Sequence, residues 1–374
     1  MRILFADQYS AFGGAQLVLR DVIAGAIREG WEAELAAPGN GPLLDICPSA
    51  AFPLFRYTNG RKTALEFVKY SVDMARTAAA IREITRRRPP DLIYVNGPRI
   101  LPAATAQGLP VVFHSHSLLA RGYARWIANR CVRAANALVI ASSGFVRAPL
   151  SHGDCEIIYN GVSDLGFFRK NPRGNSVHIG ILGRISPEKG HLDFIDAARV
   201  LASLYTEARF SVFGAGLFSD PGFERTVRAA AAGSPVEFRG WTNDVAGALH
   251  EVDLLAVPSG ELEATPRVIM EAFSAGTPVV AYPSGGIREL VRDGETGFLT
   301  ADATAFSLVV AIRKALASPE RMAQVSANAR REWKARFRVE RMQSEICDLI
   351  RKRFANKSRQ ADAAAAVACI ENAV

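Results

Sequence analysis

Short apolar runs alternate with longer amphipathic stretches along the first half of the chain. The apolar runs predict strands at residues 2–6, 32–37, 92–95, 111–113, 138–141 and 156–159. Helical patterns lie between several of them, the longest at residues 14–29 and 63–87. Alternation of this kind is typical of a parallel sheet that is covered by helices on both faces.

The same rhythm starts again after a polar segment rich in helix breakers, Lys170 to Ser176, which we interpret as a linker. Further strands are predicted at residues 177–182, 209–213, 236–239, 254–257 and 279–281. A chain of 374 residues has room for two domains of ordinary size. We therefore predict an α/β protein with Rossmann-like domains at 1–170 and 171–340, a terminal helix at 341–354 that packs toward the N-terminal domain, and a flexible tail at 355–374.

The most informative stretch follows one of the buried strands of the second half. Glu263 and Glu271 stand there with seven residues between them. Thr265 is predicted to be the N-cap, and Pro266 the first residue, of a helix that ends at Ala275. The free N–H groups of this helix would suit an anionic ligand that also offers hydroxyls, such as a sugar nucleotide. The alternative is a solvated helix face that carries two glutamates.

Three segments together carry a resemblance to a known family. They are Gly183-Arg184-Ile185-Ser186-Pro187-Glu188-Lys189-Gly190, Glu263 to Gly276, and Pro278 to Gly297, with weaker matches at Gly13 to Gln16 and Asn160 to Val162. With these motifs the chain resembles the retaining, nucleotide-sugar-dependent glycosyltransferases of family 4, also called glycosyl transferases group 1. The resemblance implies the GT-B fold, in which two Rossmann-like domains face a central cleft. The first domain would bind the acceptor and the second the donor.

Two cations follow the first strand of the second domain, at the edge where open α/β sheets bind ligands. Arg184 and Lys189, with Gly183 before them, could stabilise the negative charge of a diphosphate leaving group. A solvated loop with two basic residues is the alternative. The chain contains no Asp-x-Asp pair of the kind that holds a divalent metal. We therefore expect no metal and no cofactor, the nucleotide sugar being a co-substrate.

The resemblance also implies roles for the acidic stretch. Glu271 would bond the ribose of the nucleotide, and Glu263 would lie beside the hydroxyls of the donor sugar. The family often has Phe-Gly after the first glutamate, where this chain has Ala-Thr-Pro. Thr265, Pro266 and Arg267 are still expected to form a cradle for a phosphate or a sugar.

Glycines and histidines complete the expected site. Gly13 and Gly14 would form the wall of the first domain near the donor phosphates and the acceptor, although a tight turn explains them equally well. Gly240 ends a later strand and would border the nucleobase, with an ordinary turn as the alternative. The family commonly has a histidine near the reacting sugar, which favours His116 over His114, and a purely structural histidine is the other interpretation.

Charge separates the two halves of the chain, whose net charge is +8. Residues 1–170 hold 20 Lys and Arg against 13 Asp and Glu, while residues 171–374 hold 25 against 24. Arginines and aromatic residues recur between Arg121 and Arg133 at a spacing that fits an amphipathic helix on an anionic membrane. The alternative is a solvated helix beside a core. No nucleic-acid-binding module accompanies the charge, so nucleic acid is not an expected partner.

Localisation and acceptor follow from the same features. Five cysteines without regular spacing indicate a reducing compartment. The N-terminus lacks the apolar region of a signal peptide, and no run is long enough to span a bilayer. We expect a cytoplasmic enzyme, peripheral at the inner face of the membrane, that acts on a glycan or a lipid-linked saccharide.

Three other functions deserve comparison with this one. A sugar-nucleotide epimerase or hydrolase shares the two-domain architecture. A dinucleotide-dependent oxidoreductase is disfavoured because residues 6–40 lack Gly-x-Gly-x-x-Gly with a following acidic residue. A catalytically silent subunit of another transferase is disfavoured because both cations and both glutamates are present.

Overall fold

The protein, seen here as a computed structural model, consists of two compact units. The structure describes residues 1–52, 64–120, 122–150, 154–168, 176–216 and 221–354. The first unit contains residues 1–142, 146–158 and 340 onward, and the second contains 143–145 and 159–339. The sequence placed the division at residue 170, whereas the structure places it before Tyr159, whose hydroxyl donates to Glu289 of the second unit at 2.9 Å. Residues 170–175 of the expected linker and the expected tail at 355–374 lie outside the described residues.

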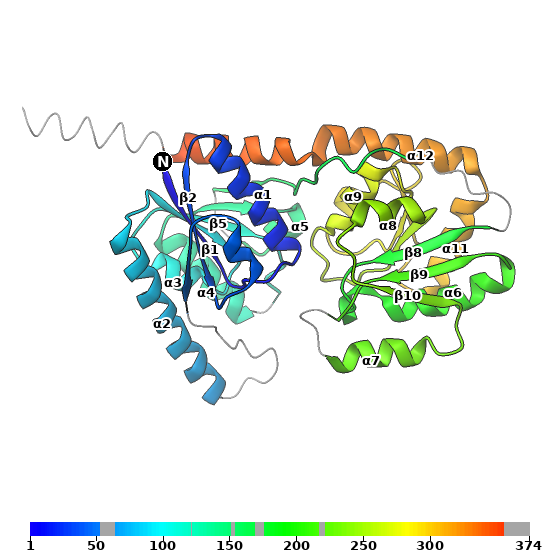
Figure 1. Ribbon diagram of the computed structural model, residues 1–374, viewed down its shortest axis with the longest axis horizontal. Helices are drawn as coiled ribbons and strands as arrows, with labels where there is room; N and C mark the ends of the chain where they lie inside the picture. Colours follow the sequence, from blue (N-terminus) through cyan, green and yellow to red (C-terminus); the bar gives the residue numbers. More distant parts are fainter. Residues whose placement is uncertain (53–63, 121, 151–153, 169–175, 217–220, 355–374) are drawn as a thin grey trace, which may run out of the picture. The chain divides into compact units, whose positions relative to one another are not determined.

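The first unit is built on a sheet of seven parallel strands in the order β3-β2-β1-β4-β5-β6-β7. Strands β1, β2 and β5 of this sheet are labelled in Figure 1. Its strands are β1 (Arg2–Asp7), β2 (Glu32–Pro38), β3 (Ser49–Phe52), β4 (Leu92–Asn96), β5 (Val111–Ser115), β6 (Leu138–Ala141) and β7 (Cys155–Ile157). Its helices are α1 (Gly14–Arg28), the 3₁₀ turn η1 (Pro42–Asp45), α2 (Ala64–Arg87), α3 (Leu101–Thr105) and α4 (Gly122–Ala134); the short α5 (Gly144–Arg147) begins in the second unit.

Helices cover both faces of this sheet, so its central strands are buried along their whole length. Every residue of β4 and β5 is buried. On one side α2 contacts α3, and α3 contacts α4. The helical residues 340–354 pack beside α1, where the Gln343 side chain donates to the carbonyl of Asp21 at 2.6 Å (Figure 1). Among the described residues, no helix combines the length and the apolar composition that a bilayer crossing requires.

The second unit repeats the plan with six parallel strands in the order β10-β9-β8-β11-β12-β13. Its strands are β8 (His178–Leu182), β9 (Arg209–Phe213), β10 (Val236–Gly240), β11 (Leu254–Val257), β12 (Val279–Ala281) and β13 (Phe298–Leu299). Its helices are the 3₁₀ turn η2 (Pro187–Lys189), α6 (His191–Leu204), α7 (Pro221–Ala230), α8 (Val245–Glu251), α9 (Arg267–Ala275), α10 (Ile287–Leu290), α11 (Ala305–Leu316), α12 (Pro319–Glu332) and the π-helical turn η3 (Trp333–Phe337).

The second sheet separates two hydrophobic cores. Strand β11 sends Leu254 and Ala256 into the core under α6 and α11, and it sends Leu255 and Val257 into the core under α8 and α9. Successive strand residues point to opposite faces, so a strand covered on both sides is apolar at every position. This is why the uninterrupted run 254–257 predicted the strand correctly.

Strand order reverses once in each sheet. Crossovers run outward from β1 and β4 in the first sheet, and from β8 and β11 in the second. The loops that leave two such strands diverge at their carboxyl ends, and ligands of open α/β sheets bind at this point. Ligand-binding residues are therefore expected in the loops that follow β1 and β4, and β8 and β11.

Candidate functional site

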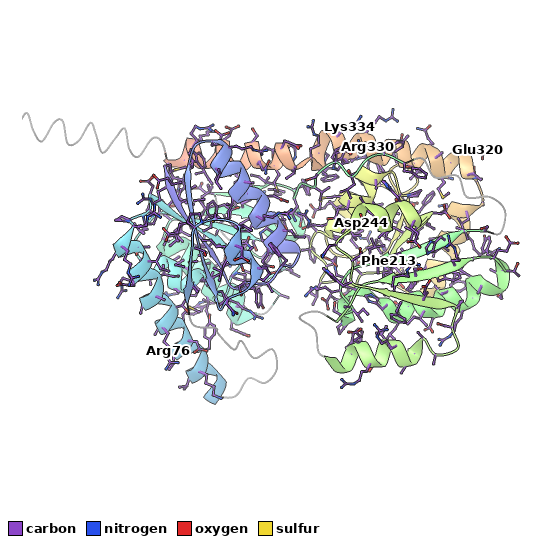
Figure 2. All side chains as sticks on the ribbon, in the orientation of Figure 1. Arg76, Phe213, Asp244, Glu320, Arg330 and Lys334 are labelled. Atoms are coloured by element: carbon purple, nitrogen blue, oxygen red, sulfur yellow. The ribbon has the colours of Figure 1, made fainter. Side chains whose placement is uncertain are left out.

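The loop after β8 is held against its neighbours by main-chain contacts. The N–H of Gly183 donates to the carbonyl of Phe213 at 3.0 Å. Phe213, labelled in Figure 2, is the last residue of β9. Gly183 has a φ of +145°, and Gly190, at the other end of the loop, has a φ of +71°. A Cβ at Gly190 would lie 1.9 Å from the carbonyl oxygen of Pro258, so only glycine allows this loop to approach the end of β11.

The expected cations Arg184 and Lys189 both lie in this loop. Arg184 pairs with Glu188 at 3.4 Å. Burial alone would raise the pKa of Glu188, but the Ser186 hydroxyl, its own backbone and the two cations hold that pKa below its ordinary value. Burial, followed by the charge of Lys189, lowers the pKa of the adjacent His191 to about 4. The positive charge of the loop therefore comes from the arginine and the lysine.

The loop after β11 is joined to the loop after β8 by one ion pair and one backbone hydrogen bond. The Lys189 Nζ atom lies 2.5 Å from Glu263 Oε2, and these side chains are only 20% and 11% exposed. The N–H of Gly260 donates to the carbonyl of Glu188 at 2.8 Å. The structure therefore brings two residues of separate sequence motifs, 74 positions apart, into contact at the reversal point between β8 and β11.

Helix α9 begins one residue later than the sequence predicts. Arg267 is its first residue, and Pro266 occupies the N-cap position without a side-chain cap. The prediction that Thr265 caps this helix is wrong, because Pro266 holds the cap position. The Thr265 hydroxyl instead accepts a hydrogen bond from the Asn160 side chain at 3.2 Å. The end is as predicted: Gly276 follows Ala275 with a φ of +80°.

Arg267 and Glu271 pair with each other on the first turns of α9. The Arg267 Nε atom lies 3.5 Å from Glu271 Oε1, and both side chains are largely buried. The same guanidinium donates to the carbonyl of Gly161 at 3.3 Å. The arginine therefore connects the Asn160–Gly161 turn to the glutamate, which is a contact that the sequence analysis did not anticipate.

A glycine pair that sequence analysis left without a role supports the acidic loop. The N–H of Gly286 donates to the carbonyl of Glu263 at 3.0 Å. A Cβ at Gly285 would lie 2.0 Å from that same oxygen, and one at Gly286 would lie 1.7 Å from the carbonyl oxygen of Ala264. The pair is thus required for the close packing of the turn after β12 on the Glu263 backbone. The position of this glycine pair directly after a short apolar strand is the sequence feature that could have indicated such a role.

Gly240 stands apart from this cluster. It ends β10, an edge strand that is separated from β8 by β9. Its φ of +74° explains the glycine as a turn residue, and a Cβ there would meet nothing within 4 Å. No contact described for the unit links Gly240 to Lys189 or Glu263.

The remaining candidates, Gly13, Gly14 and His116, lie in the first unit. Gly13 precedes α1, and Gly14 is its first residue. His116 follows β5, and its Nε2 atom lies 2.7 Å from Asn96 Oδ1 at the end of β4. His114 is completely buried, and its Nδ1 atom lies 2.6 Å from the Tyr94 hydroxyl. These residues surround the reversal point between β1 and β4.

The described residues contain no group of three or more His, Cys, Asp and Glu side chains that could hold a metal ion. The clustered charges at the second reversal point are instead three ion pairs: Arg184 with Glu188, Lys189 with Glu263, and Arg267 with Glu271. This arrangement can receive an anion next to hydroxyl groups, because cationic side chains bind phosphate oxygens and carboxylates accept from hydroxyls.

Comparisons with known proteins agree with this geometry. Residues 12–164 match the model described as Glycosyltransferase Family 4, and residues 164–332 match the model described as Glycosyl transferases group 1. The lipopolysaccharide 1,2-N-acetylglucosaminetransferase of Salmonella typhimurium is 35% identical over 148 residues, which are 37% of this chain and 39% of that protein. The glycogen synthase of Mycobacterium tuberculosis is 26% identical over 247 residues, which are 60% of this chain and 58% of that protein. The chain thus spans well under two thirds of the length of these curated relatives.

Solved structures extend the likeness to nearly the whole chain. Anabaena HepE, solved in complex with UDP-glucose, has a TM-score of 0.78 at 26% identity, and the match covers 94% of this chain and all of that one. A sucrose-phosphate synthase from Thermosynechococcus elongatus has a TM-score of 0.77 at 19% identity over 95% of this chain and all of that one, which shows the fold alone. The two family models together span residues 12–332, and the chain belongs to the group 1, family 4 glycosyltransferases, with the GT-B fold of two Rossmann-like units.

Proposed function

We propose that this protein transfers a sugar from a nucleotide-diphosphate sugar to a hydroxyl of a glycan or lipid-linked saccharide, with retention of anomeric configuration. The observation that carries the proposal is the Lys189–Glu263 pair at 2.5 Å, which joins the loops after β8 and β11 where the strand order reverses. A cation for the diphosphate and a carboxylate for the sugar hydroxyls then stand side by side. Family membership supports the reaction class.

In this mechanism Arg184 and Lys189 stabilise the charge that develops on the diphosphate as the glycosidic bond breaks. Preorganised cations at the leaving group act without reorganisation during the reaction, and each is worth a large factor in rate. We propose that they do so without a metal ion, which is consistent with the lack of an Asp-x-Asp pair in the sequence. Glu263 would accept from hydroxyls of the donor sugar.

The nucleoside would be held by the start of α9. Glu271 would accept from the ribose hydroxyls, and Arg267 would hold its carboxylate through their 3.5 Å ion pair. Thr265 and Pro266 precede the free N–H groups of this helix, which would bind phosphate or sugar oxygens. Gly13, Gly14 and His116 would contact the donor and acceptor from the first unit, and Gly240 would border the base.

A ligand-dependent melting experiment tests the donor proposal. HepE binds UDP-glucose, so UDP-sugars come first, with GDP- and ADP-sugars beside them. A donor at about a hundred times its dissociation constant should stabilise the protein by about 2.7 kcal/mol. Lys189→Met should lose most of this shift, whereas Lys314→Met, at a surface lysine, should keep it. A shift of equal size in both variants would contradict the assigned site.

Product analysis separates transfer from the rival functions. An isomerised sugar nucleotide that forms without acceptor would indicate an epimerase. A donor that binds but is neither transferred nor hydrolysed with any acceptor would indicate a silent subunit. A glycosidic product with the anomeric configuration of the donor is the result that we expect.

The exposed face of α4 suggests where the acceptor is found. Trp126 and Tyr123 are 61% and 52% exposed, so they do not belong to the core. Arg130 lies with its guanidinium 5.8 Å from the Trp126 ring centre, and both border a groove of about 310 Å³ between α3 and α4. Surfaces that bind anionic membranes combine exposed aromatic rings with arginines in this way. We therefore propose peripheral association with an anionic bilayer that carries the acceptor.

Vesicle sedimentation tests the membrane proposal. The protein should pellet with vesicles that contain anionic lipid at low salt, and it should be released by high salt because exposed charges are screened. Trp126→Ala combined with Arg130→Glu should abolish pelleting. Phe306→Ala, which removes an exposed aromatic residue of the second unit, is the control. Failure of the unmodified protein to pellet at low salt would refute the membrane proposal and leave the donor site untouched.

A further inference from the structure

A chain of buried polar groups connects the carboxyl ends of β1, β4 and the residue after β5. Asp7 ends β1, Asn96 ends β4, and both are almost completely buried. The Asn96 Nδ2 atom lies 2.5 Å from Asp7 Oδ2, and the Asn96 Oδ1 atom lies 2.7 Å from His116 Nε2. The family resemblance implied a role for His116, and no sequence motif pointed to Asp7 or Asn96.

The direction of each hydrogen bond is fixed by chemistry. The carboxylate of Asp7 and the carbonyl oxygen of Ala15, 3.3 Å away, are both acceptors, so the side of the Asn96 amide that faces them must be the NH₂ group. The other side, which faces His116, is therefore the amide oxygen. Because an amide oxygen only accepts, His116 must carry a hydrogen on Nε2. In a neutral ring the other nitrogen, Nδ1, is then the acceptor.

The group that accepts from His116 Nε2, the Asn96 amide, is uncharged. A carboxylate in the position of Asn96 would stabilise a doubly protonated imidazole, which an amide does much less. Two of the titratable groups near the ring are His114, whose ring centre is 3.9 Å from that of His116, and Asp7 beyond the amide. Burial keeps the pKa of His114 well below its ordinary value, so that ring is neutral. Burial also raises the pKa of Asp7 to about 6, although Asn96 and other hydrogen-bond donors oppose this shift.

We propose that Asp7 and Asn96 are positioning residues that hold His116 as a neutral imidazole with its hydrogen on Nε2, so that Nδ1 accepts from a ligand hydroxyl. On this assignment His116 is a hydrogen-bond acceptor rather than a proton donor. The ligand hydroxyl belongs to a sugar only if the proposed transferase function holds. The state of the ring does not depend on that function.

The same groups hold the glycine turn that precedes α1. The Gln16 side chain donates to both oxygens of Asp7, at 3.0 and 3.1 Å, and the carbonyl of Ala15 accepts from Asn96. The turn that contains Gly13 and Gly14 is thereby tied to the element that orients His116. Asp7 and Asn96 thus position two of the predicted ligand contacts of the first unit together.

Nitrogen-15 NMR of the histidine side chains tests the assignment in the unmodified 374-residue chain without any donor. The His116 signals, identified by their loss in His116→Gln, should show one protonated and one unprotonated nitrogen at pH 7, with the hydrogen on Nε2. A doubly protonated ring at pH 7, or a hydrogen on Nδ1, would overturn the proposal. This measurement needs no turnover, so its result stands even if no transfer is found.

A charge substitution supplies the functional test. Asn96→Asp alone would set two carboxylates about 2.5 Å apart, which would share one proton. Combined with Asp7→Asn, it places a single carboxylate against Nε2, so His116 should gain a second proton at pH 7 and lose its acceptor. Sugar transfer should fall about tenfold, as expected for the loss of one hydrogen bond in the complex, and should recover as the pH rises. Asn136→Asp makes the same change at a residue that contacts Arg353 instead, and its pH profile should match that of the unmodified protein. A pH-independent loss in the variant with both Asp7→Asn and Asn96→Asp would be a purely structural defect and would contradict the proposal. If this variant does not fold, the ring state of the unmodified protein decides.

Discussion

Replacing Lys189 with methionine removes one charge of the Lys189–Glu263 pair while keeping most of the side-chain volume. Exposed ion pairs contribute about 0.2–1 kcal/mol, and breaking a fully buried one costs about 3–5 kcal/mol. With side chains 20% and 11% exposed and atoms 2.5 Å apart, this pair lies between these limits. We therefore expect Lys189→Met to lower the free energy of unfolding by about 2 kcal/mol.

A double-mutant cycle isolates the pair from other effects of the substitution. Lys189→Met, Glu263→Gln and the double variant are unfolded with denaturant, and the coupling free energy should be about 1–2 kcal/mol, since the second change costs little once the partner is gone. Lys314→Met is the matched control, because Lys314 is half exposed and lies 3.8 Å from Asp293. It should cost less than about 1 kcal/mol. Additivity within about 0.3 kcal/mol would show that the Lys189–Glu263 pair does not form in solution.

The rate of sugar transfer is measured for the same variants. If Lys189 stabilises the leaving diphosphate, Lys189→Met should lower kcat by about 10²–10³, as removal of one charge-stabilising group does in other enzymes. A variant that loses stability but keeps kcat would assign the lysine a structural role only. The two measurements thus separate what the pair does for the fold from what it does for the reaction.

Three other predictions follow from particular residues. Gly190→Ala should lower the melting temperature far more than Gly233→Ala. Both glycines have a φ near +70°, but a Cβ at residue 190 would lie 1.9 Å from the Pro258 carbonyl oxygen, whereas one at residue 233 would meet nothing within 4 Å. Equal melting temperatures would refute the close packing of the loop after β8 on the end of β11. Asp7, whose pKa is about 6 when folded, binds a proton more tightly in the folded than in the unfolded state, so its contribution to stability is present below pH 4 and is lost as the pH rises through 6. Relative to the unmodified protein, Asp7→Asn should therefore gain about 2.4 kcal/mol between pH 4 and pH 7, measured by denaturant unfolding at each pH; a constant difference would mean that the pKa of Asp7 is not shifted. Transfer should persist in excess EDTA, and its loss with recovery on adding Mg²⁺ or Mn²⁺ would replace the two cations with a metal in the mechanism.

The apolar pattern predicted the inner strands of both sheets because these strands are covered on both faces, and it missed the short edge strands β3 and β13. A strand buried on two sides needs apolar side chains at every position, and the run 254–257 became β11 without adjustment. The loops between strands were recognisable through glycines. Gly190 and Gly276 both have a positive φ, which few other residues adopt. The sequence alone therefore predicted those features in which the backbone conformation or the burial of a residue determines its type.

Contacts between distant parts of the chain were beyond local rules. Thr265 has the residue type of an N-cap, yet a side chain 105 positions away binds its hydroxyl. Arg267 was predicted to be a ligand residue, and nothing in the sequence shows that it also donates to the Gly161 carbonyl, 106 positions away. Asp7 and Asn96 are single polar residues at strand ends, and nothing in the sequence shows that they meet across 89 positions. Such pairings depend on strand order, which composition and periodicity do not specify.

The packing of residues 340–354 on α1 has a consequence for synthesis of the chain. Gln343 covers Gly25, where a Cβ would lie 2.9 Å from the glutamine side chain, and binds the backbone at Asp21. The face of α1 around Gly25 therefore stays uncovered until residue 343 has left the ribosome, after the whole of 159–339 has been translated. Nascent proteins usually complete their N-terminal domain first. In this chain most of the first unit is synthesised first but can complete its packing only last. We therefore expect the first unit to depend on chaperones during translation.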